Sequence, residues 1–210
     1  MRMWYILLWI CVAAMPTAAA EAPDKALVGI QRAVDSNDPV LLEKYLDVGG
    51  VITKGVDEFI ADFASNPPGG EGDPLLEMLS GGLAAGRETQ AAQSMRLLLI
   101  EETRKFVVWG VASGNFSGQP SRSKNQPNGG ILSALFADAS TARKELRSVR
   151  CDSPKADTAT ATARMYDHGS ERSYPLQIRL KRQQQGHWKV TEVSNMTELI
   201  RMVRREAEAR

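Results

Sequence analysis

Apolar residues recur at intervals of three and four between residues 23 and 64, which is the spacing that gathers side chains on one face of an α-helix. The spacing predicts three consecutive helices, each with its own apolar stripe. The stripes are Ala26, Leu27, Ile30, Ala33 and Val34, then Leu41, Leu42, Tyr45 and Leu46, then Ile52, Val56, Phe59, Ile60 and Phe63. Asp38 followed by Pro39 is a start signal for the second helix, and Gly49-Gly50 is expected to end it.

The middle of the chain is also predicted to be mostly helical. Asp73-Pro74 starts a helix with Leu75, Leu76, Leu79 and Leu83, which Gly81-Gly82 should shorten or kink. A longer helix is expected over residues 88–105, and the spacing leaves open whether residues 106–111 continue it or form a strand. Residues 113–130 have the composition of a flexible surface loop, and a short helix is expected over residues 131–139.

The spacing changes to strict alternation near residue 158, which is typical of half-buried β-strands. Runs over 158–166, 174–181 and 188–192 are separated by the turn sequences Asp167-His168-Gly169-Ser170 and Gln185-Gly186. They predict a three-stranded, or slightly larger, antiparallel meander. Asn195-x-x-Glu198 is a capping-box variant that should open a short carboxy-terminal helix. The expected fold class is therefore α+β, with a helical amino-terminal and middle part packed on the meander.

The alternation assigns the strand residues to two faces of the sheet. The apolar face carries Ala159, Ala161, Ala163, Met165, Leu176, Ile178, Leu180, Trp188 and Val190. Its small alanines either seat a helix closely or leave a ligand cavity. The other face carries Arg164, Arg179, Lys181 and Lys189 among Thr160, Thr162, Gln177 and Thr191. A solvated sheet face has this polarity, and so does a surface that meets an anionic polymer such as a cell-envelope polysaccharide.

The amino terminus has the pattern of a secretory signal peptide over residues 1–20. Arg2 precedes an apolar run over residues 3–15, and Ala18-Ala19-Ala20 supplies the small residues of a cleavage site. The run is short for a bilayer span, which takes about 20 apolar residues, although an uncleaved anchor is the alternative. Lipid attachment at Cys11 would require a small residue before it, where Ile10 stands. A single α+β domain is expected over residues 21–210, periplasmic or secreted.

Charge and cysteine content narrow the classes of partner. The formal net charge is +1, and removal of the signal with Arg2 makes basic and acidic side chains equal in number. This balance gives no case for a nucleic-acid binder or for long-range attraction to an anionic membrane. Cys151 would be the one cysteine left after cleavage, so an intramolecular disulfide is excluded. The sequence around it, Val149 to Ser153, looks like the start of a strand, and Cys151 itself is a buried apolar side chain, a free thiol or an intermolecular link.

Motifs for catalysis are absent from the sequence. His168 and His187 stand at or beside the predicted turns, and neither belongs to a motif with the spacing of metal ligands. Asp167, His168 and Ser170 are the residue types of a catalytic triad, but neighbours within one turn rarely adopt triad geometry. Asn115 and Asn195 begin glycosylation sequons, and a helix cap explains Asn195 better. Accordingly, no catalytic, cofactor-binding or metal-binding residues are predicted.

Two segments carry a resemblance to known protein families. Tyr174 to Leu180 with Gly186 to Asn195, and the helix–break–helix opening from Ala26 to Asp47, resemble exported bacterial domains of unknown function. The carboxy-terminal pattern is also similar to the cystatin-like and nuclear-transport-factor-two-like superfamily. That resemblance implies a curved sheet that wraps a helix and often holds a pocket. The long helical middle over residues 73–140 departs from a minimal member of the superfamily.

The function expected from these observations is a non-enzymatic binding or interaction domain of the bacterial cell envelope. Its partner would be an envelope protein or an apolar small ligand, with no nucleic acid and no stable membrane span after cleavage. The alternative is a small pocket enzyme on a curved antiparallel sheet. An enzyme requires titratable groups with perturbed pKa values that converge in a cavity, whereas a binding domain requires only an apolar cleft.

Overall fold

The computed structural model describes residues 21–66, 81, 89–119 and 142–208 of the chain. The predicted signal, the predicted helices over 73–83 and 131–139 apart from residue 81, and residues 120–130 of the predicted loop lie outside these ranges. The described helices are α1 (Asp24–Asp35), α2 (Pro39–Tyr45), α3 (Val48–Ser65), α5 (Gln90–Ala112), the 3₁₀ turn η1 (Asn115–Ser117) and α7 (Met196–Glu208). The described strands are β1 (Lys144–Cys151), β2 (Thr158–Asp167), β3 (Arg172–Arg182) and β4 (Trp188–Val193). The fold class is α+β, as predicted.

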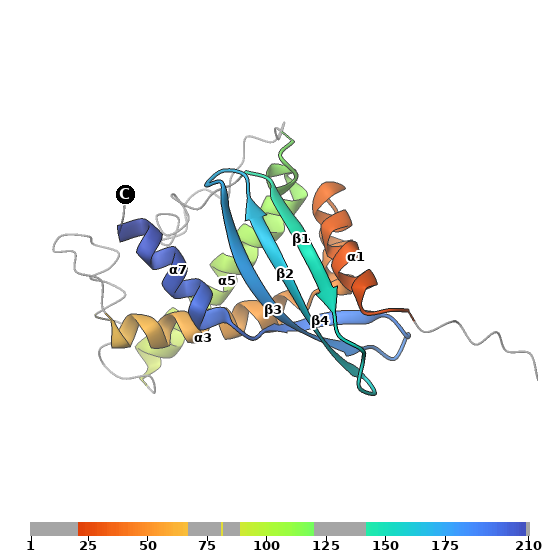
Figure 1. The fold of residues 1–210 in the computed structure, drawn as a ribbon. Helices are drawn as coiled ribbons and strands as arrows, with labels where there is room; N and C mark the ends of the chain where they lie inside the picture. Colours follow the sequence, from red (N-terminus) through yellow and green to blue (C-terminus); the bar gives the residue numbers. More distant parts are fainter. Residues whose placement is uncertain (1–20, 67–80, 82–88, 120–141, 209–210) are drawn as a thin grey trace, which may run out of the picture.

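Within the described residues, the strands form one antiparallel sheet with the order β1-β2-β3-β4 (Figure 1). The meander prediction is confirmed for β2, β3 and β4, and β1 is the additional strand. Its alternation is interrupted by a bulge: Arg147 pairs with Arg164 and Arg150 pairs with Thr162, so Ser148 and Val149 share one partner position. Cys151 ends β1, so the expectation that a strand starts there is wrong. The Cys151 side chain is half-buried, so it is neither a fully buried core residue nor an exposed thiol.

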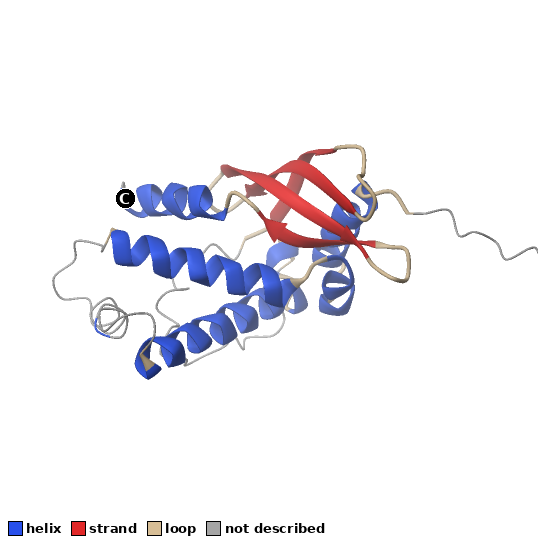
Figure 2. Cartoon of the chain, turned by 90° about the horizontal axis from the view of Figure 1, so that it is seen from below, coloured by secondary structure: helices blue, strands red, loops and turns tan. Residues whose placement is uncertain are grey.

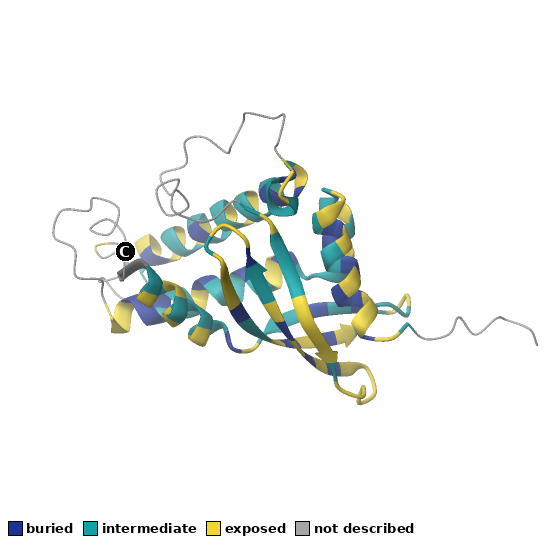
Figure 3. Cartoon of the chain, turned by 45° about the horizontal axis from the view of Figure 1, so that its top comes forward, coloured by how far each residue is buried: buried dark blue, intermediate teal, exposed yellow. Residues whose placement is uncertain are grey.

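The apolar face of the sheet packs on α1, which lies against one side of it (Figures 1 and 2). The buried cluster contains Ala26 and Leu27 of α1 with Ala159, Ala161, Ala163, Ile178, Leu180, Trp188 and Val190. Met165 and Leu176, also predicted for this face, are half-buried. Buried and exposed residues alternate along β2 and β3, as Figure 3 shows. Strand alternation thus places one face in the core and the other in solvent.

A second apolar cluster joins the helices to one another. Its buried members come from α1, α2, α3 and α5: Ala33, Leu42, Val48, Ile52, Val56, Ile60, Phe63, Leu99 and Val111. The third predicted stripe is therefore confirmed on α3. The predicted helix over 88–105 is confirmed as α5, which runs on to Ala112 and so includes residues 106–111. No helix in the described ranges is long and apolar enough to cross a membrane.

The helix starts follow local capping chemistry. The Asp38 carboxylate accepts a hydrogen bond from the Leu41 N–H at 2.9 Å, which confirms the predicted start of α2. Asp47 accepts from the Gly50 N–H at 3.1 Å and caps α3 in the same way. Gly49-Gly50 consequently lies in the first turn of α3, and the prediction that it ends α2 is wrong. α2 ends earlier because the backbone of Leu46 is extended and forms an isolated β-bridge with Val190 of β4.

The capping role predicted for the Asn195 side chain is wrong. Its Nδ2 donates to the Pro175 carbonyl at 2.8 Å, and its Oδ1 accepts from the Gln177 N–H at 2.9 Å. Both amide atoms are thus bound to β3, and the residue is 9% exposed. Glu198, the other half of the expected capping box, is exposed. Asn195 therefore anchors the start of α7 to the sheet.

Candidate functional site

An apolar cleft lies between α3, α5 and the start of α7. It has a volume of about 350 Å³. Its lining residues are Val51, Ile52, Gly55, Val56, Phe59, Leu99, Thr103 and Met196. Thr103 is the one polar side chain in that lining, and no titratable side chain contributes. A site of this composition can hold an apolar group by burial, and the Thr103 hydroxyl offers one hydrogen bond.

The cleft exists because a glycine on α3 faces a methionine on α7. A Cβ atom built on Gly55 would lie 3.5 Å from Met196 Cε and 3.7 Å from its sulfur, which is ordinary van der Waals contact. Glycine at this position therefore leaves room that an alanine would begin to fill. Met196 is flexible and adapts its shape to what it packs against, a property common at apolar binding surfaces.

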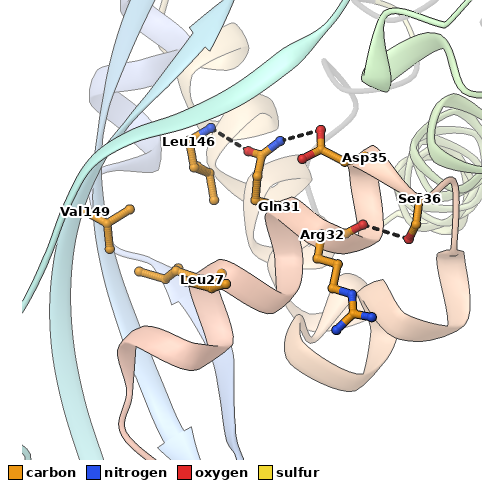
Figure 4. A pocket seen from close by; sticks show the side chains of 8 residues that line it. Leu27, Gln31, Arg32, Asp35, Ser36, Leu146 and Val149 are labelled. Carbon is orange, nitrogen blue, oxygen red and sulfur yellow. Dashed lines mark hydrogen bonds between the residues drawn. The ribbon is translucent and has the colours of Figure 1, made fainter.

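A groove between α1 and the outer edge of β1 is the second hollow in the described ranges (Figure 4). Leu27, Val28, Leu146 and Val149 supply apolar lining, and Gln31, Arg32, Asp35 and Ser36 supply polar lining. The Gln31 amide bonds the β1 edge that faces away from β2: Oε1 accepts from the Leu146 N–H at 2.7 Å, as Figure 4 shows, and Nε2 donates to the Lys144 carbonyl at 3.4 Å. A side-chain amide therefore caps part of the β1 edge against pairing with another strand.

The third hollow lies where α7 meets the end of α3 and the sheet. Asp62, whose side chain is 2% exposed, is paired with Arg204 at 2.8 Å and with Arg201 at 3.7 Å. Arg204 also donates to the Asn66 carbonyl at 2.7 Å, and Asn66 Nδ2 donates to Asp62 Oδ1 at 3.2 Å. A buried carboxylate with two arginines is a structural ion pair that joins α3 and α7.

The alanine face of β2 is core. Ala159, Ala161 and Ala163 are 3–6% exposed and share a cluster with Ala26 and Leu27 of α1. Trp188 is fully buried in that cluster, and its indole Nε1 donates to the Glu21 carbonyl at 2.6 Å. Of the two interpretations of the small residues, the structure supports the seat for a helix.

A cluster of titratable groups surrounds the turn between β2 and β3. The Asp167 carboxylate, 8% exposed, accepts from Lys144 Nζ at 2.6 Å, the Gly169 N–H at 3.0 Å and the Ser170 hydroxyl at 3.0 Å. Burial lowers the pKa of the Lys144 ammonium, and its hydrogen bond to Asp167 acts in the opposite direction. These contacts stabilise the hairpin, because the side chain of Asp167 closes its own turn.

His168 takes no part in a triad. Its Nε2 lies 2.9 Å from Glu145 Oε2, and its ring packs edge-on against Tyr166. Ser170 donates directly to Asp167, so no histidine stands between serine and carboxylate. The hydrogen bond from the Arg147 guanidinium, and to a smaller extent that from His168, lowers the pKa of Glu145 from 4.5 to about 2. His187 packs edge-on against Tyr45.

Among the described residues, no group of three His, Cys, Asp or Glu side chains lies close enough together to hold a metal ion. Burial raises the pKa of the Cys151 thiol, which disfavours the reactive thiolate.

No protein-family model, curated protein or solved structure matches the chain. The resemblance to exported domains and to the cystatin-like and nuclear-transport-factor-two-like superfamily therefore stays a prediction.

Sequence reasoning did not find the apolar cleft. Ile52, Val56 and Phe59 belong to a predicted stripe, but a stripe does not show which members are buried between helices and which border a hollow. The available signal was Gly55, a glycine on the same face as that stripe and one turn from Phe59.

Proposed function

We propose that this protein is an exported, non-enzymatic binding domain that holds an apolar small ligand, or an apolar side chain of an envelope protein, in the cleft between α3, α5 and α7. The observation that carries the proposal is the composition of the cleft, whose lining is apolar apart from Thr103. Its volume of about 350 Å³ falls in the range of small-molecule sites.

The enzyme alternative has weaker support. Enzymes bring titratable groups with perturbed pKa values into a cavity. In the described ranges, three of the groups with perturbed pKa values, Lys144, Glu145 and Tyr174, are engaged by Asp167, Arg147 and Glu206 respectively. None of these groups lines the three hollows described above. Burial lowers the pKa of Lys144 and raises that of Tyr174, and the hydrogen bond to Arg147 lowers that of Glu145, so contacts within the fold account for these shifts.

Titration with N-phenyl-1-naphthylamine, a neutral apolar fluorophore, tests the cleft. The wild-type chain is expected to bind one equivalent with enhanced fluorescence. Gly55→Leu should fill the cleft and weaken that binding by about tenfold or more, since about 1.4 kcal/mol of lost burial is a factor of ten. Gly49→Leu is the matched control, because it adds the same side chain to an exposed position at the start of the same helix.

Thermal melts accompany the titration and separate loss of the site from loss of the fold. Gly55→Ala is the milder variant, since its Cβ meets Met196 at ordinary contact distance. It should melt no lower than wild type, because glycine costs about 1 kcal/mol in a helix interior relative to alanine, and it should bind the probe less tightly. Two results would overturn the proposal: equal binding by the Gly55→Leu and Gly49→Leu variants, or no binding by wild type.

A further inference from the structure

The solvent face of the sheet gathers six cationic side chains, which we call the basic face. They are Arg147, Arg150, Arg164, Arg179, Lys181 and Lys189, and they come from all the strands of the described sheet. Residues that pair across neighbouring strands point to the same face, so the register places them together. Arg147 pairs with Arg164, and Lys181 pairs with Lys189.

Arg147 and Arg179 pair with Glu145 and Glu192, but the described part of the fold does not neutralise the other four positive charges. In the described residues, Arg150, Arg164, Lys181 and Lys189 form no ion pair. The carboxylates that reach this face are already engaged: Glu145 by Arg147 and His168, Asp152 by Thr160, and Glu192 by Lys54 and Arg179. Like charges directly opposite each other destabilise a sheet. Solvation alone explains a polar face, but it does not explain Lys181 directly opposite Lys189, neither of which has an ionic partner in the described residues.

The rest of the chain balances this charge at a distance. Residues 21–66 contain nine acidic and four basic side chains, whereas residues 142–193 contain eleven basic and six acidic ones. The balanced net charge therefore conceals a separation of charge between the first helices and the sheet. An anionic molecule would be drawn to the sheet and repelled by the helices, which gives the basic face its selectivity.

We infer that the basic face binds an acidic, carboxylate-bearing polysaccharide. Thr162 and Gln177 are register partners that stand between the cations on β2 and β3, and their hydroxyl and amide groups can bond sugar hydroxyls. Arginine matches a carboxylate with two parallel hydrogen bonds. Nucleic acid is disfavoured because the aromatic ring on this face, Tyr166, is covered by the Arg147 guanidinium at 3.8 Å and offers no stacking platform. A lipid surface is disfavoured because these strand positions present no large apolar side chain for insertion.

Titration with polygalacturonate oligosaccharide at low ionic strength tests the inference, with neutral dextran of equal size as the ligand control. Wild type is expected to bind polygalacturonate and not dextran, and added salt should weaken binding as it screens the charges. The triple variant Arg150→Gln, Arg164→Gln and Lys181→Gln should bind about tenfold more weakly. Its melting temperature should hold or rise, because the variant relieves repulsion and breaks no ion pair in the described residues.

The matched control is Lys25→Gln, Arg32→Gln and Arg205→Gln, which removes the same charge from positions on α1 and α7 that lie away from the sheet's solvent face. It should bind within about twofold of wild type, since these cations lie off the basic face. Equal loss in both triple variants would reduce the effect to net charge and overturn the inference. Absence of polygalacturonate binding would overturn it as well, and so would tighter binding to phosphatidylglycerol vesicles or to single-stranded DNA. Probe binding in the α3–α5 cleft is independent of each of these results.

Discussion

At the scale of single residues, small and charged side chains decide how closely the layers approach. Ala161 of β2 lies between its register partners Cys151 and Ile178 and is 3% exposed. Its side chain faces the cluster that contains Leu27 and Trp188. A close-packed core of this kind does not accept added methylenes without moving its neighbours.

Ala161→Leu is therefore expected to overpack the core and lower the free energy of unfolding by about 1–3 kcal/mol. Thr162→Leu is the control, because it adds an apolar side chain at the next, exposed position of the same strand and should change stability by less than about 0.5 kcal/mol. Denaturant unfolding of both variants measures the difference. An unchanged or raised stability of the Ala161 variant would reveal a cavity beside the alanine strand.

Glu145 carries a prediction of pH dependence. Its hydrogen bonds to Arg147 and His168 hold its pKa at about 2, below the value of 4.5 expected for the unfolded chain. A depressed pKa means that the folded state favours the carboxylate, so the contribution to stability is present above pH 4.5 and is lost as the pH falls through about 2. Carboxyl chemical shifts followed against pH should give this midpoint. Arg147→Gln should raise it, while Lys155→Gln, in the β1–β2 turn, should leave it unchanged; a midpoint near 4.5 in wild type would contradict the assignment.

At the scale of elements, polar contacts attach the last described helix, α7, and the residue before it to two elements, α3 and β3. Asn195 bonds β3, Thr197 donates to Glu58 of α3 at 2.7 Å, and Arg204 pairs with Asp62 of α3. Tyr174 of β3 donates to Glu206 at 2.8 Å near the far end of the helix. The helix therefore bridges α3 and the sheet, and its first residue, Met196, completes the apolar cleft.

Asn195→Ser distinguishes an anchor from a cap. Serine is a good capping residue, so a cap would survive the change. The serine side chain is too short to reproduce both bonds to Pro175 and Gln177, and buried backbone groups left without partners cost about 1–3 kcal/mol. We expect a loss of stability in this range by denaturant unfolding, together with faster hydrogen exchange in α7. Glu198→Ala serves as the control and should cost less than about 0.5 kcal/mol; the reverse order of the two variants would restore the capping-box interpretation.

At the scale of the whole molecule, charge is segregated and the predicted mature chain begins at a tethered residue. The Glu21 carbonyl accepts from the buried Trp188 indole, and cleavage after Ala20 would preserve this bond. The predicted mature chain would thus start at the sheet. Its acidic helices and its basic face then lie on different parts of one molecule, which suits separate sites for an apolar group and for an acidic polymer.

Export with cleavage is expected to yield a native-host protein whose first residue is Glu21 by mass spectrometry. A double variant, Ala18→Leu with Ala20→Leu, should block processing, because the cleavage site requires small residues at those two positions. Ala19→Leu is the control, since the position between them is not restricted. An intact Met1 on membrane-bound wild-type protein would show that the segment is kept as an anchor.

Periodicity by itself determined much of this fold. Burial acts on spacing, so the stripe on α3 and the alternation on β2 and β3 are enough to indicate which of their side chains face the core. Local chemistry did the same for the start of α2, because Asp38 bonds an N–H only three residues away. These features depend on near neighbours in the chain.

Tertiary structure decided what depends on distant neighbours. The bulge in β1 breaks the alternation that would have revealed the strand, and Asn195 bonds residues 18 and 20 positions before it, so its local capping pattern was misleading. The cleft needs Gly55, Leu99 and Met196 from three helices, and the basic face needs a register that sets Arg147 beside Arg164. Spacing shows which side of an element a residue occupies, but the packing of elements determines what lies opposite it.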